Sequence, residues 1–409
     1  MKRRYSIPIL SLGLFVFILG LGAYLKDPIE NVPDQETAYI EASPLEDKED
    51  ELEVIEEEKE SLVRLVAVGD LMFHMPQNRA AYDKEKGLYD YSRIFQQIKP
   101  YIEGADIAIG NFETVTAGGE LGYSGYPRFN TPKESLLAIK ETGFHILSTA
   151  NNHCLDQGAR GIINTIDNIH ELGMKNIGTY KSPEDNEILV EEVNSIRMGF
   201  LAYTYGLNGL DYLLSREELS YMINLIDEER IRSDIERAKD MDLDLIVVSI
   251  HWGNEYQRKA HTSQIELGEK IIEWGGDIVL GSHPHVIQDS QIIERDGQNK
   301  FIIYSLGNFV SNQRQETMGN SYTEDGLIVE IEIEKDLIKG ETRIRDIHFI
   351  PTWVYRYREE DKWEYEILPI SDLLEDKDEV FAHIRPRLEK SYRDTMEKVT
   401  ENSLYSELN

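Results

Sequence analysis

Two histidines follow a short apolar run near the middle of this 409-residue chain. The apolar run Asp277–Gly281 is followed by Ser282, His283, Pro284 and His285. Such a run is typical of a strand buried on both faces, and the residues after it would lie at the strand's carboxyl end, where open α/β sheets bind ligands. Imidazole is a good ligand for zinc, iron, copper or nickel, and Pro284 restricts the backbone between the two rings. Taken alone, the stretch fits a metal site and a pair of ordinary loop histidines equally well.

The same pattern, an apolar run that ends in polar residues, occurs at five other places. The runs at 62–68, 105–110, 144–150, 243–250 and 301–305 are followed by Asp70, by Asn111 and Glu113, by Asn152 and His153, by His251, and by Asn308. Helical periodicity is present between them at 159–172, 226–241 and 263–274. This alternation predicts a largely parallel sheet with helices on its faces and six strand ends at one rim.

The polar residues at these strand ends suit two divalent metal ions. Paired ions that share a bridging group lie roughly 3.5–4 Å apart and take carboxylate, amide and imidazole ligands. The candidate ligands are Asp70, Glu113, Asn152, His251, His283 and His285. Each one singly fits a turn, a helix cap or a core position, but their joint occurrence at successive strand ends favours a metal site. The chain has one cysteine, Cys154, so a Cys-based zinc site is excluded.

Charge and hydropathy divide the chain. The formal net charge is −33, and a surface of this sign repels phosphates, so nucleic acid is excluded as a partner. A basic N-terminus precedes an uncharged apolar run at 7–25, which as a helix would span roughly 28 Å. This predicts a membrane anchor over residues 1–26 with the bulk of the chain outside the cell, and a cleaved signal peptide is the alternative. Residues 27–61 contain 15 Asp or Glu and 2 Lys, which predicts an acidic, disordered stalk.

The C-terminal part has a different pattern. Strict alternation of apolar and polar residues at 327–334, continued at 342–357, predicts antiparallel strands. The last forty or so residues are charged and helical in pattern. We therefore expect a main domain over residues 62–315, with strands and a charged helix at 316–409 that complete or flank it.

The motifs resemble the CapA family of poly-γ-glutamate capsule biosynthesis proteins, which is similar in turn to the calcineurin-like metallophosphoesterases. The resemblance covers about residues 62–310 and rests on six motifs, Gly69-Asp70, Gly110–Glu113, Asn151–Gly158, His251–Tyr256, Gly281–Val286 and Tyr304–Phe309. It implies an α/β fold, a metallophosphoesterase-like layered α/β/α sandwich. An N-terminal transmembrane helix would precede this sandwich and a small C-terminal β/α extension would follow it.

The resemblance also implies roles for individual residues. Asp70 and His285 would bind one divalent metal ion. Asn152, His251 and His283 would bind the second, with Mn, Fe or Zn as candidates for both. Glu113 would bridge the two ions, where the wider superfamily uses Asp. His153 matches the general acid, which Asp156 would orient unless it only caps the following helix.

The first motif departs from the superfamily pattern. Met72 stands where the superfamily has His, and His74 follows two residues later. Further candidates for supporting or substrate-binding roles are His74, Asn111, Asp156, Glu255 and Asn308.

Three functions remain open. The chain can be an outward-facing hydrolase or transferase acting on a phosphoester or on the amide linkages of an anionic polymer. It can instead be a subunit of a capsule synthesis and export complex that uses its metal site for binding, with other capsule subunits as partners. The third is a glycosidase-like pair, Glu113 and Glu255, that needs no metal. We favour capsule biosynthesis and leave the chemical step open.

Overall fold

The structure is a computed structural model that describes residues 59–375 and 379–401. The predicted membrane anchor, and all of the predicted stalk except residues 59–61, lie outside the described residues. Among the helices of the described part, none is both long and apolar enough to cross a membrane.

The first sheet is organised around β1 (Glu60–Leu71). In spatial order its strands are β16 (Lys362–Pro369), β15 (Glu341–Glu359), β14 (Asp325–Asp336), β1, β4 (Ile107–Phe112), β5 (Ile146–Ser148) and β6 (Lys175–Ile177), and β13 (Asn308–Val310) also pairs with β1. Strands β1, β4, β5 and β6 run parallel to one another, whereas β14, β15 and β16 are antiparallel to their neighbours. The alternating C-terminal segments therefore extend the first sheet, as antiparallel strands.

The second sheet contains the strand that precedes the His-Pro-His stretch. Its order is β11 (Ser290–Arg295), β12 (Gln298–Ile303), β10 (Ile278–Ser282), β9 (Leu245–His251), β8 (Ile196–Thr204) and β7 (Leu189–Val193). The four central strands are parallel and the two edge strands are antiparallel. Strand β8 lies between β7 and β9, although the sequence-based prediction did not include it.

The two sheets pack face to face. Leu65 and Ala67 of β1 point into a core that they share with Val247 of β9 and Leu280 of β10. Alternate residues of β1 point to the opposite face, because successive side chains of a strand alternate sides. There Val66 packs in a second core with residues of three helices, α2 (Ser92–Phe95), α3 (Lys99–Glu103) and α4 (Glu134–Thr142).

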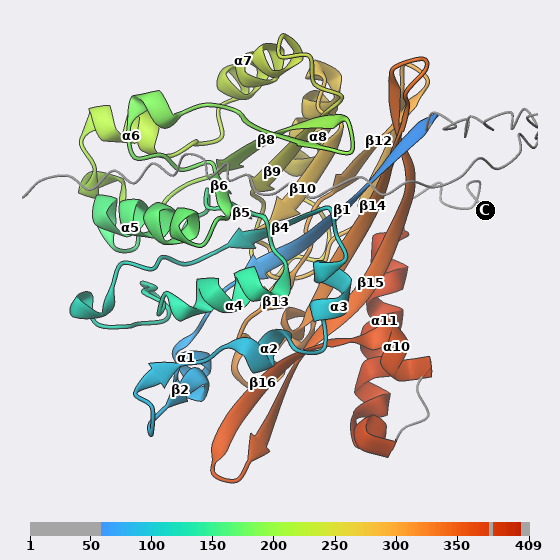
Figure 1. The fold of residues 1–409 in the computed structure, drawn as a ribbon. Coiled ribbons are helices and arrows are strands. Elements are labelled where there is room, and N and C mark those ends of the chain that lie inside the picture. The colour runs from blue at the N-terminus through green and yellow to red at the C-terminus, as the bar shows by residue number, and fades with distance from the viewer. Residues whose placement is uncertain (1–58, 376–378, 402–409) are drawn as a thin grey trace, which may run out of the picture. The chain divides into compact units, whose positions relative to one another are not determined.

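Two further helices cover the outer face of the second sheet. Ile235 of α7 (Glu228–Lys239) and Ile271 of α8 (Thr262–Trp274) pack against Val248 of β9. Figure 1 shows α7 and α8 beside β8, β9 and β10. The described part therefore has four layers, a helix layer, two sheets and a second helix layer. The α/β class is confirmed, but two mixed sheets replace the single, largely parallel sheet of the predicted α/β/α sandwich. A continuous apolar run shows that both faces of a strand are buried, and it does not show whether a helix or a second sheet covers each face.

The remaining helices lie at the edges of these layers. Helices α10 (Ile370–Glu375) and α11 (Arg385–Val399) pack on β15 and β16 through Trp353, Leu368 and Leu388. Helix α5 (Gly158–Glu171) shares a small core with α6 (Arg216–Met222). The short elements are α1 (Met75–Ala81), α9 (Gln315–Met318), the hairpin β2 (Tyr82–Asp83) and β3 (Leu88–Tyr89), and the 3-10 turns η1 (Gly119–Leu121), η2 (Pro183–Asp185), η3 (Asp211–Leu213), η4 (Ser321–Glu324) and η5 (Glu379–Ile384). The predicted domain boundary near residue 315 stays a prediction.

Candidate metal centre

The predicted ligands come from the carboxyl ends of strands in both sheets. Asp70 lies near the end of β1, Glu113 directly follows β4, and His251 is the last residue of β9. Ser282 ends β10 and is paired with His251 in register, so His283 begins the loop beside it. Asn152 follows β5. One buried cluster therefore joins residues that are as much as 215 positions apart in the sequence.

Two glycines let the backbone approach closely at this cluster. A Cβ atom on Gly69 would lie 1.9 Å from the carbonyl oxygen of Gly307, and a Cβ atom on Gly281 would lie 2.1 Å from the carbonyl oxygen of Tyr304. Neither distance is possible for a side chain. The glycines that precede Asp70 and His283 in their motifs are therefore required by packing between neighbouring segments.

Asp70 and Glu113 form the acidic middle of the cluster. Both side chains are fully buried. Asn111 Nδ2 donates to Asp70 Oδ1 at 2.8 Å and lies 3.5 Å from Glu113 Oε2. Glu113 Oε1 has no hydrogen-bond partner. Among the described residues, no Arg or Lys forms an ion pair with either carboxylate, so the centre has unbalanced negative charge when both are ionised.

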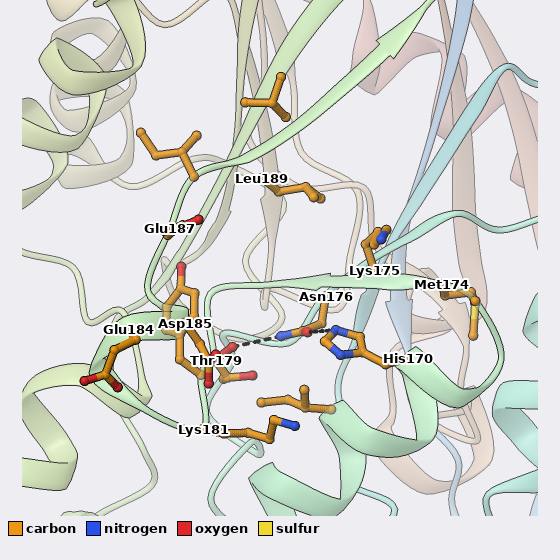
Figure 2. Close-up of a pocket in the computed structure, with 15 residues that line it drawn as sticks. His170, Met174, Lys175, Asn176, Thr179, Lys181, Glu184, Asp185, Glu187 and Leu189 are labelled. Atoms are coloured by element: carbon orange, nitrogen blue, oxygen red, sulfur yellow. Dashed lines mark hydrogen bonds between the residues drawn. The ribbon is translucent and has the colours of Figure 1, made fainter. Parts of the chain in front are cut away.

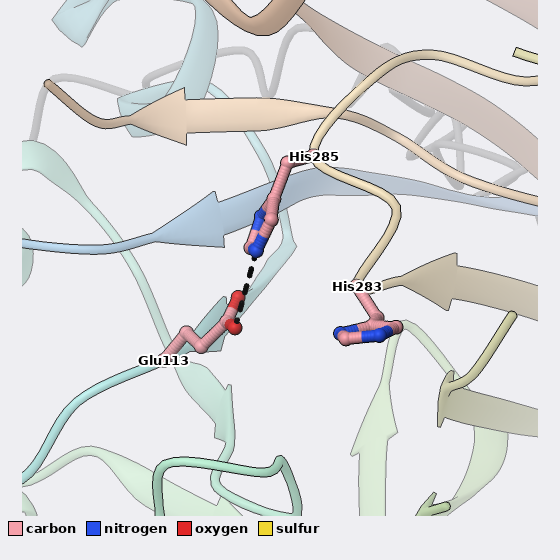
Figure 3. Close-up of side chains that lie close together, drawn as sticks. All are labelled: Glu113, His283 and His285. Carbon is pink, nitrogen blue, oxygen red and sulfur yellow. Dashed lines mark ion pairs between the residues drawn. The ribbon is translucent and has the colours of Figure 1, made fainter. Parts of the chain in front are cut away.

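Histidines surround these carboxylates. Glu113 Oε1 lies 3.6 Å from His251 Nε2 and 3.7 Å from His285 Nε2. His285 Nδ1 lies 3.0 Å from Asp70 Oδ2, and the ring of His283 lies 4.8 Å from that of His251, centroid to centroid. Figure 3 shows the carboxylate of Glu113 directed at the ring of His285, with His283 on the neighbouring part of the same loop.

The His-Pro-His loop has an unusual backbone. His283 has φ of 98° and His285 has φ of 58°, both in the left-handed region. Residues other than Gly adopt this region rarely, and they persist there where the surrounding structure holds them, commonly at functional sites. Both histidines place a ring nitrogen within 4.8 Å of a carboxylate oxygen of Glu113. His283 Nδ1 is buried and has no hydrogen-bond partner.

Asn152 and Asn308 each lie against one of the clustered histidines. Asn152 Oδ1 is 3.1 Å from His251 Nε2. Asn308 Oδ1 lies 3.2 Å from His285 Nδ1, and its Nδ2 donates to backbone and side-chain oxygens behind the loop. Asn308 thus holds the His285 ring, whereas Asn152 presents its carbonyl oxygen to the centre.

His153 lies beside the cluster and is held by two neighbours. Its Nδ1 is 2.8 Å from Asp156 Oδ2, and its ring packs edge-on against Phe129 at 4.8 Å. The backbone N–H of Phe129 also donates to Asp156 Oδ2 at 2.6 Å. Asp156 therefore fixes the orientation of the imidazole through Nδ1.

The remaining two candidates lie at the margin. His74 caps the start of α1, and its Nδ1 accepts a hydrogen bond from the backbone N–H of Asn312 at 3.3 Å. Glu255 is exposed on the loop after β9. Glu113 is fully buried, so the two carboxylates of the glycosidase-like alternative have very different environments.

Burial controls protonation at this centre. It raises the pKa of Glu113 well above its ordinary value, and the neighbouring Asp70 raises it further. Burial, together with neighbouring histidines, also lowers the pKa of His251 well below its ordinary value and that of His283 to about 3. These imidazoles are therefore neutral at physiological pH, which is the form that binds metal ions.

The donor set fits divalent metal ions. In the described part of the chain, two groups have ligand atoms that all lie within 4.8 Å of one another, Glu113 with His283 and His285, and Glu113 with Asp70 and His251. Glu113 belongs to both groups and has an unpartnered oxygen. A cation would offset the two buried carboxylates and give that oxygen, and His283 Nδ1, a partner.

The sequence-based prediction missed four residues at this centre. Ser282 Oγ lies 3.0 Å from His251 Nδ1, and Phe129 packs on His153. Tyr205 and Asn208 accept hydrogen bonds from Asn152. The signal for Tyr205 was present, because it follows the apolar strand β8 in the same way that the predicted ligands follow theirs.

A cavity of about 620 Å³ lies elsewhere, between α5, β6 and β7 (Figure 2). Its walls include His170, Lys175, Lys181, Glu184 and Asp185, and none of the candidate site residues. Charges of both signs line it, so it has no clear preference for one ligand class.

The fold and the site define an α/β protein of two packed sheets with a buried cluster of candidate ligands for divalent metal ions. The model of the family described as bacterial capsule synthesis protein PGA_cap matches residues 64–313, and the chain belongs to this family. The resemblance to capsule biosynthesis proteins that the motifs indicated is therefore confirmed.

Two curated relatives are named for capsule or polymer synthesis. The chain is 31% identical over 250 residues to "Capsule biosynthesis protein CapA" of Bacillus anthracis, an alignment that covers 59% of this chain and 58% of the relative. It is 28% identical over 274 residues to "PGA biosynthesis protein CapA" of Bacillus subtilis, which covers 66% of this chain and 67% of the relative. The chain thus spans less than two thirds of the first relative's length.

Solved structures are similar at lower levels. A calcineurin-like phosphoesterase, YfkN from Bacillus subtilis, aligns with a TM-score of 0.42 and 15% identity over 83% of this chain and 98% of that one. A phosphatase from Mycoplasma pneumoniae aligns with a TM-score of 0.41 and 15% identity over 71% of this chain and 93% of that one.

Proposed function

We propose that this protein is a membrane-anchored, outward-facing component of capsule biosynthesis or export, and that it binds two divalent metal ions at the centre around Glu113. Its substrate would be an anionic polymer of the poly-γ-glutamate type, or a phosphoester intermediate of the same process. The alternative is a metal-dependent phosphoesterase or polymer amide hydrolase that is not tied to capsule synthesis.

One observation carries the proposal. Glu113 Oε1 is buried, has no hydrogen-bond partner and lies 3.6 Å from His251 Nε2 and 3.7 Å from His285 Nε2. An unpaired carboxylate in a dry site is costly unless it is bonded to an opposite charge. The other five candidate ligands, which come from both sheets, gather around it. This arrangement has a simple physical reason if cations belong there, and Glu113 is then the natural bridging ligand.

The proposed division of ligands is the one that the resemblance to the metallophosphoesterases implies. Asp70 and His285, whose Oδ2 and Nδ1 atoms lie 3.0 Å apart, would hold the first ion. Asn152, His251 and His283 would hold the second, with Mn, Fe or Zn as candidates. When bound, such ions would act as Lewis acids on a phosphoryl or carbonyl oxygen of the substrate.

His153 has the position of a proton donor. Asp156 holds Nδ1, so Nε2 can give a proton to the oxygen or nitrogen that leaves. Phe129 packs on one edge of the ring and limits its rotation. The side chain is only 5% exposed, so the ring contacts little bulk water. The same residues would also serve a non-catalytic, metal-dependent binding subunit.

The first experiment tests the metal centre. The full-length chain purified in detergent should contain up to two divalent ions per chain by elemental analysis. The double substitution His283→Ala and His285→Ala should lose them, because each proposed site then loses a ligand. His348→Ala is the matched control, since His348 is half-exposed on β15. Metal content near zero in the wild-type chain would reject the proposed centre.

The second experiment tests the role in capsule formation. In a capsule-forming host that lacks its own copy, the wild-type chain should restore capsule and Glu113→Ala should not. Loss of capsule with Glu113→Ala but normal capsule with His153→Ala would reject catalysis by His153 and favour the binding subunit. Normal capsule with both variants would reject a role for the centre in this process.

Topology is tested separately. Protease added to intact protoplasts should digest the chain beyond the predicted stalk, and alkaline carbonate should leave the full-length chain in the membrane pellet. A soluble product that begins near Ala23 would show a cleaved signal peptide instead.

A further inference from the structure

Tyr205 contacts three residues of the candidate metal centre. Its backbone N–H donates to the carbonyl oxygen of His251 at 2.9 Å. Its ring is nearly parallel to that of His251 at 6.2 Å and lies 4.5 Å from that of His283. Its hydroxyl oxygen is 3.4 Å from Asn152 Nδ2, which donates to it. The side chain is 47% exposed, so one edge of the ring borders the solvent side of the centre.

Asn208 makes a second contact from the same loop. Its Oδ1 accepts a hydrogen bond from Asn152 Nδ2 at 3.3 Å. Its φ of 52° is in the left-handed region, which Asn tolerates better than most residues. Leu207, between the two, is buried in the same small core as Cys154 and Leu155, which follow Asn152 closely in sequence. The loop after β8 is therefore fixed against the segment that carries Asn152.

These contacts decide which end of the Asn152 amide faces the centre. An amide side chain has an oxygen that can bind a metal ion and a nitrogen that cannot, and the two ends have nearly the same shape. With Nδ2 held by two acceptors on the loop side, Oδ1 points inward and lies 3.1 Å from His251 Nε2. If the acceptors were absent, the amide could rotate and present its nitrogen to the centre instead.

We propose that Tyr205, assisted by Asn208, is a positioning residue that fixes Asn152 with its carbonyl oxygen toward the metal centre. This inference rests on the proposed metal centre and adds to it the loop after β8, which none of the ligand motifs contains. Groups that orient metal ligands typically change metal affinity or activity by about 10–100-fold when they are removed.

The test measures Mn²⁺ binding, not turnover. The full-length chain in detergent is stripped of metal and titrated calorimetrically with Mn²⁺, and then with Zn²⁺. Tyr205→Phe keeps the ring against His283 and removes only the hydroxyl. It should weaken one of the binding sites by about 10–100-fold. Tyr212→Phe is the matched control, because Tyr212 lies in the same segment between β8 and α6 and is 74% exposed.

The same substitution, made in a chain that also carries Asn152→Asp, separates a positioning role of Tyr205 from simple packing. In an Asn152→Asp chain the two carboxylate oxygens are equivalent, so no orientation of an amide is needed. Tyr205→Phe should therefore have little effect on affinity in this background. Thermal unfolding of the metal-free chains checks that the loop stays folded, and Tyr205→Phe should leave the midpoint unchanged.

The outcomes are distinguishable. If the wild-type chain binds neither ion, the proposed metal centre is wrong and this inference fails with it. If the wild-type chain binds metal and Tyr205→Phe binds it equally well, only the positioning role is wrong. An equal loss of affinity in the Asn152 and Asn152→Asp backgrounds would also overturn the positioning role, because packing alone would explain it.

Discussion

Replacing Glu113 by Gln should separate the stability of the metal-free chain from its response to metal. The side chain is fully buried, one of its oxygens has no hydrogen-bond partner, and the adjacent Asp70 repels its ionised form. Burial therefore favours a neutral Glu113 when no metal is bound. An amide of the same shape is also neutral and can donate to Asp70, so Glu113→Gln should not destabilise the metal-free chain. A buried group without a partner costs about 1–3 kcal/mol, which sets the scale of any gain.

The response to metal should change in the opposite sense. A ligand that binds only the folded state stabilises it by about 2.7 kcal/mol when its free concentration is 100 times Kd. The wild-type chain should show this gain in urea unfolding experiments with Mn²⁺ at that ratio. Glu113→Gln should lose most of it, because both proposed ions lose a charged ligand together. The assay is therefore a pair of unfolding curves, with and without Mn²⁺, for each chain.

Glu229→Gln is the control. It changes an exposed carboxylate on α7, a helix that carries none of the candidate site residues, and should leave both curves unchanged. A full Mn²⁺-dependent gain in Glu113→Gln would refute its role as a shared ligand. A loss of several kcal/mol in the metal-free chain would instead show that the ionised carboxylate is part of the fold. Catalysis that proceeds without metal and needs both Glu113 and Glu255 would favour the glycosidase-like alternative.

Three further results are expected. Changing His283 and His285 together to Ala should abolish Mn²⁺-dependent stabilisation, and an undiminished gain would exclude the His-Pro-His loop from the site. If the centre is catalytic, His153→Ala should keep metal content near that of the wild-type chain but lower turnover by about 10²–10⁴-fold, and an unchanged rate would remove the general acid from the mechanism. Burial, with smaller contributions from the nearby His285 and His153, lowers the pKa of His74 to about 4. The folded state then binds fewer protons than the unfolded state between about pH 4 and 6.5, so the metal-free chain should lose stability as the pH falls through that window. The free energy of unfolding that is lost through His74 should reach up to about 3 kcal/mol, less what solvent screens. His74→Asn should reduce the slope of the unfolding free energy against pH, measured by urea unfolding between pH 4 and 7. An unchanged slope would contradict the burial of this ring.

The sequence alone identified the strands that carry the candidate ligands. Runs such as Asp277–Gly281 are apolar throughout, because their strands are buried on both faces, and the chain turns polar where it leaves the sheet. Each ligand type was therefore visible as the residue after a run. The chemistry of the donors was also visible, since it depends on residue types and not on their arrangement.

The tertiary structure alone decided how these strand ends meet. Apolar runs do not state which strands pair, so the second sheet and its member β8 were not predicted, and Tyr205 at the end of β8 was missed with it. The environment of each ligand is likewise a property of contacts between distant segments. Glu113 directly follows β4 and has an unpartnered oxygen, and His283 and His285 come close to it from the loop that follows β10, where both have positive φ angles. Sequence patterns repeat every two to four residues and carry information about local structure, whereas the charge balance and geometry of this centre depend on groups more than a hundred residues apart.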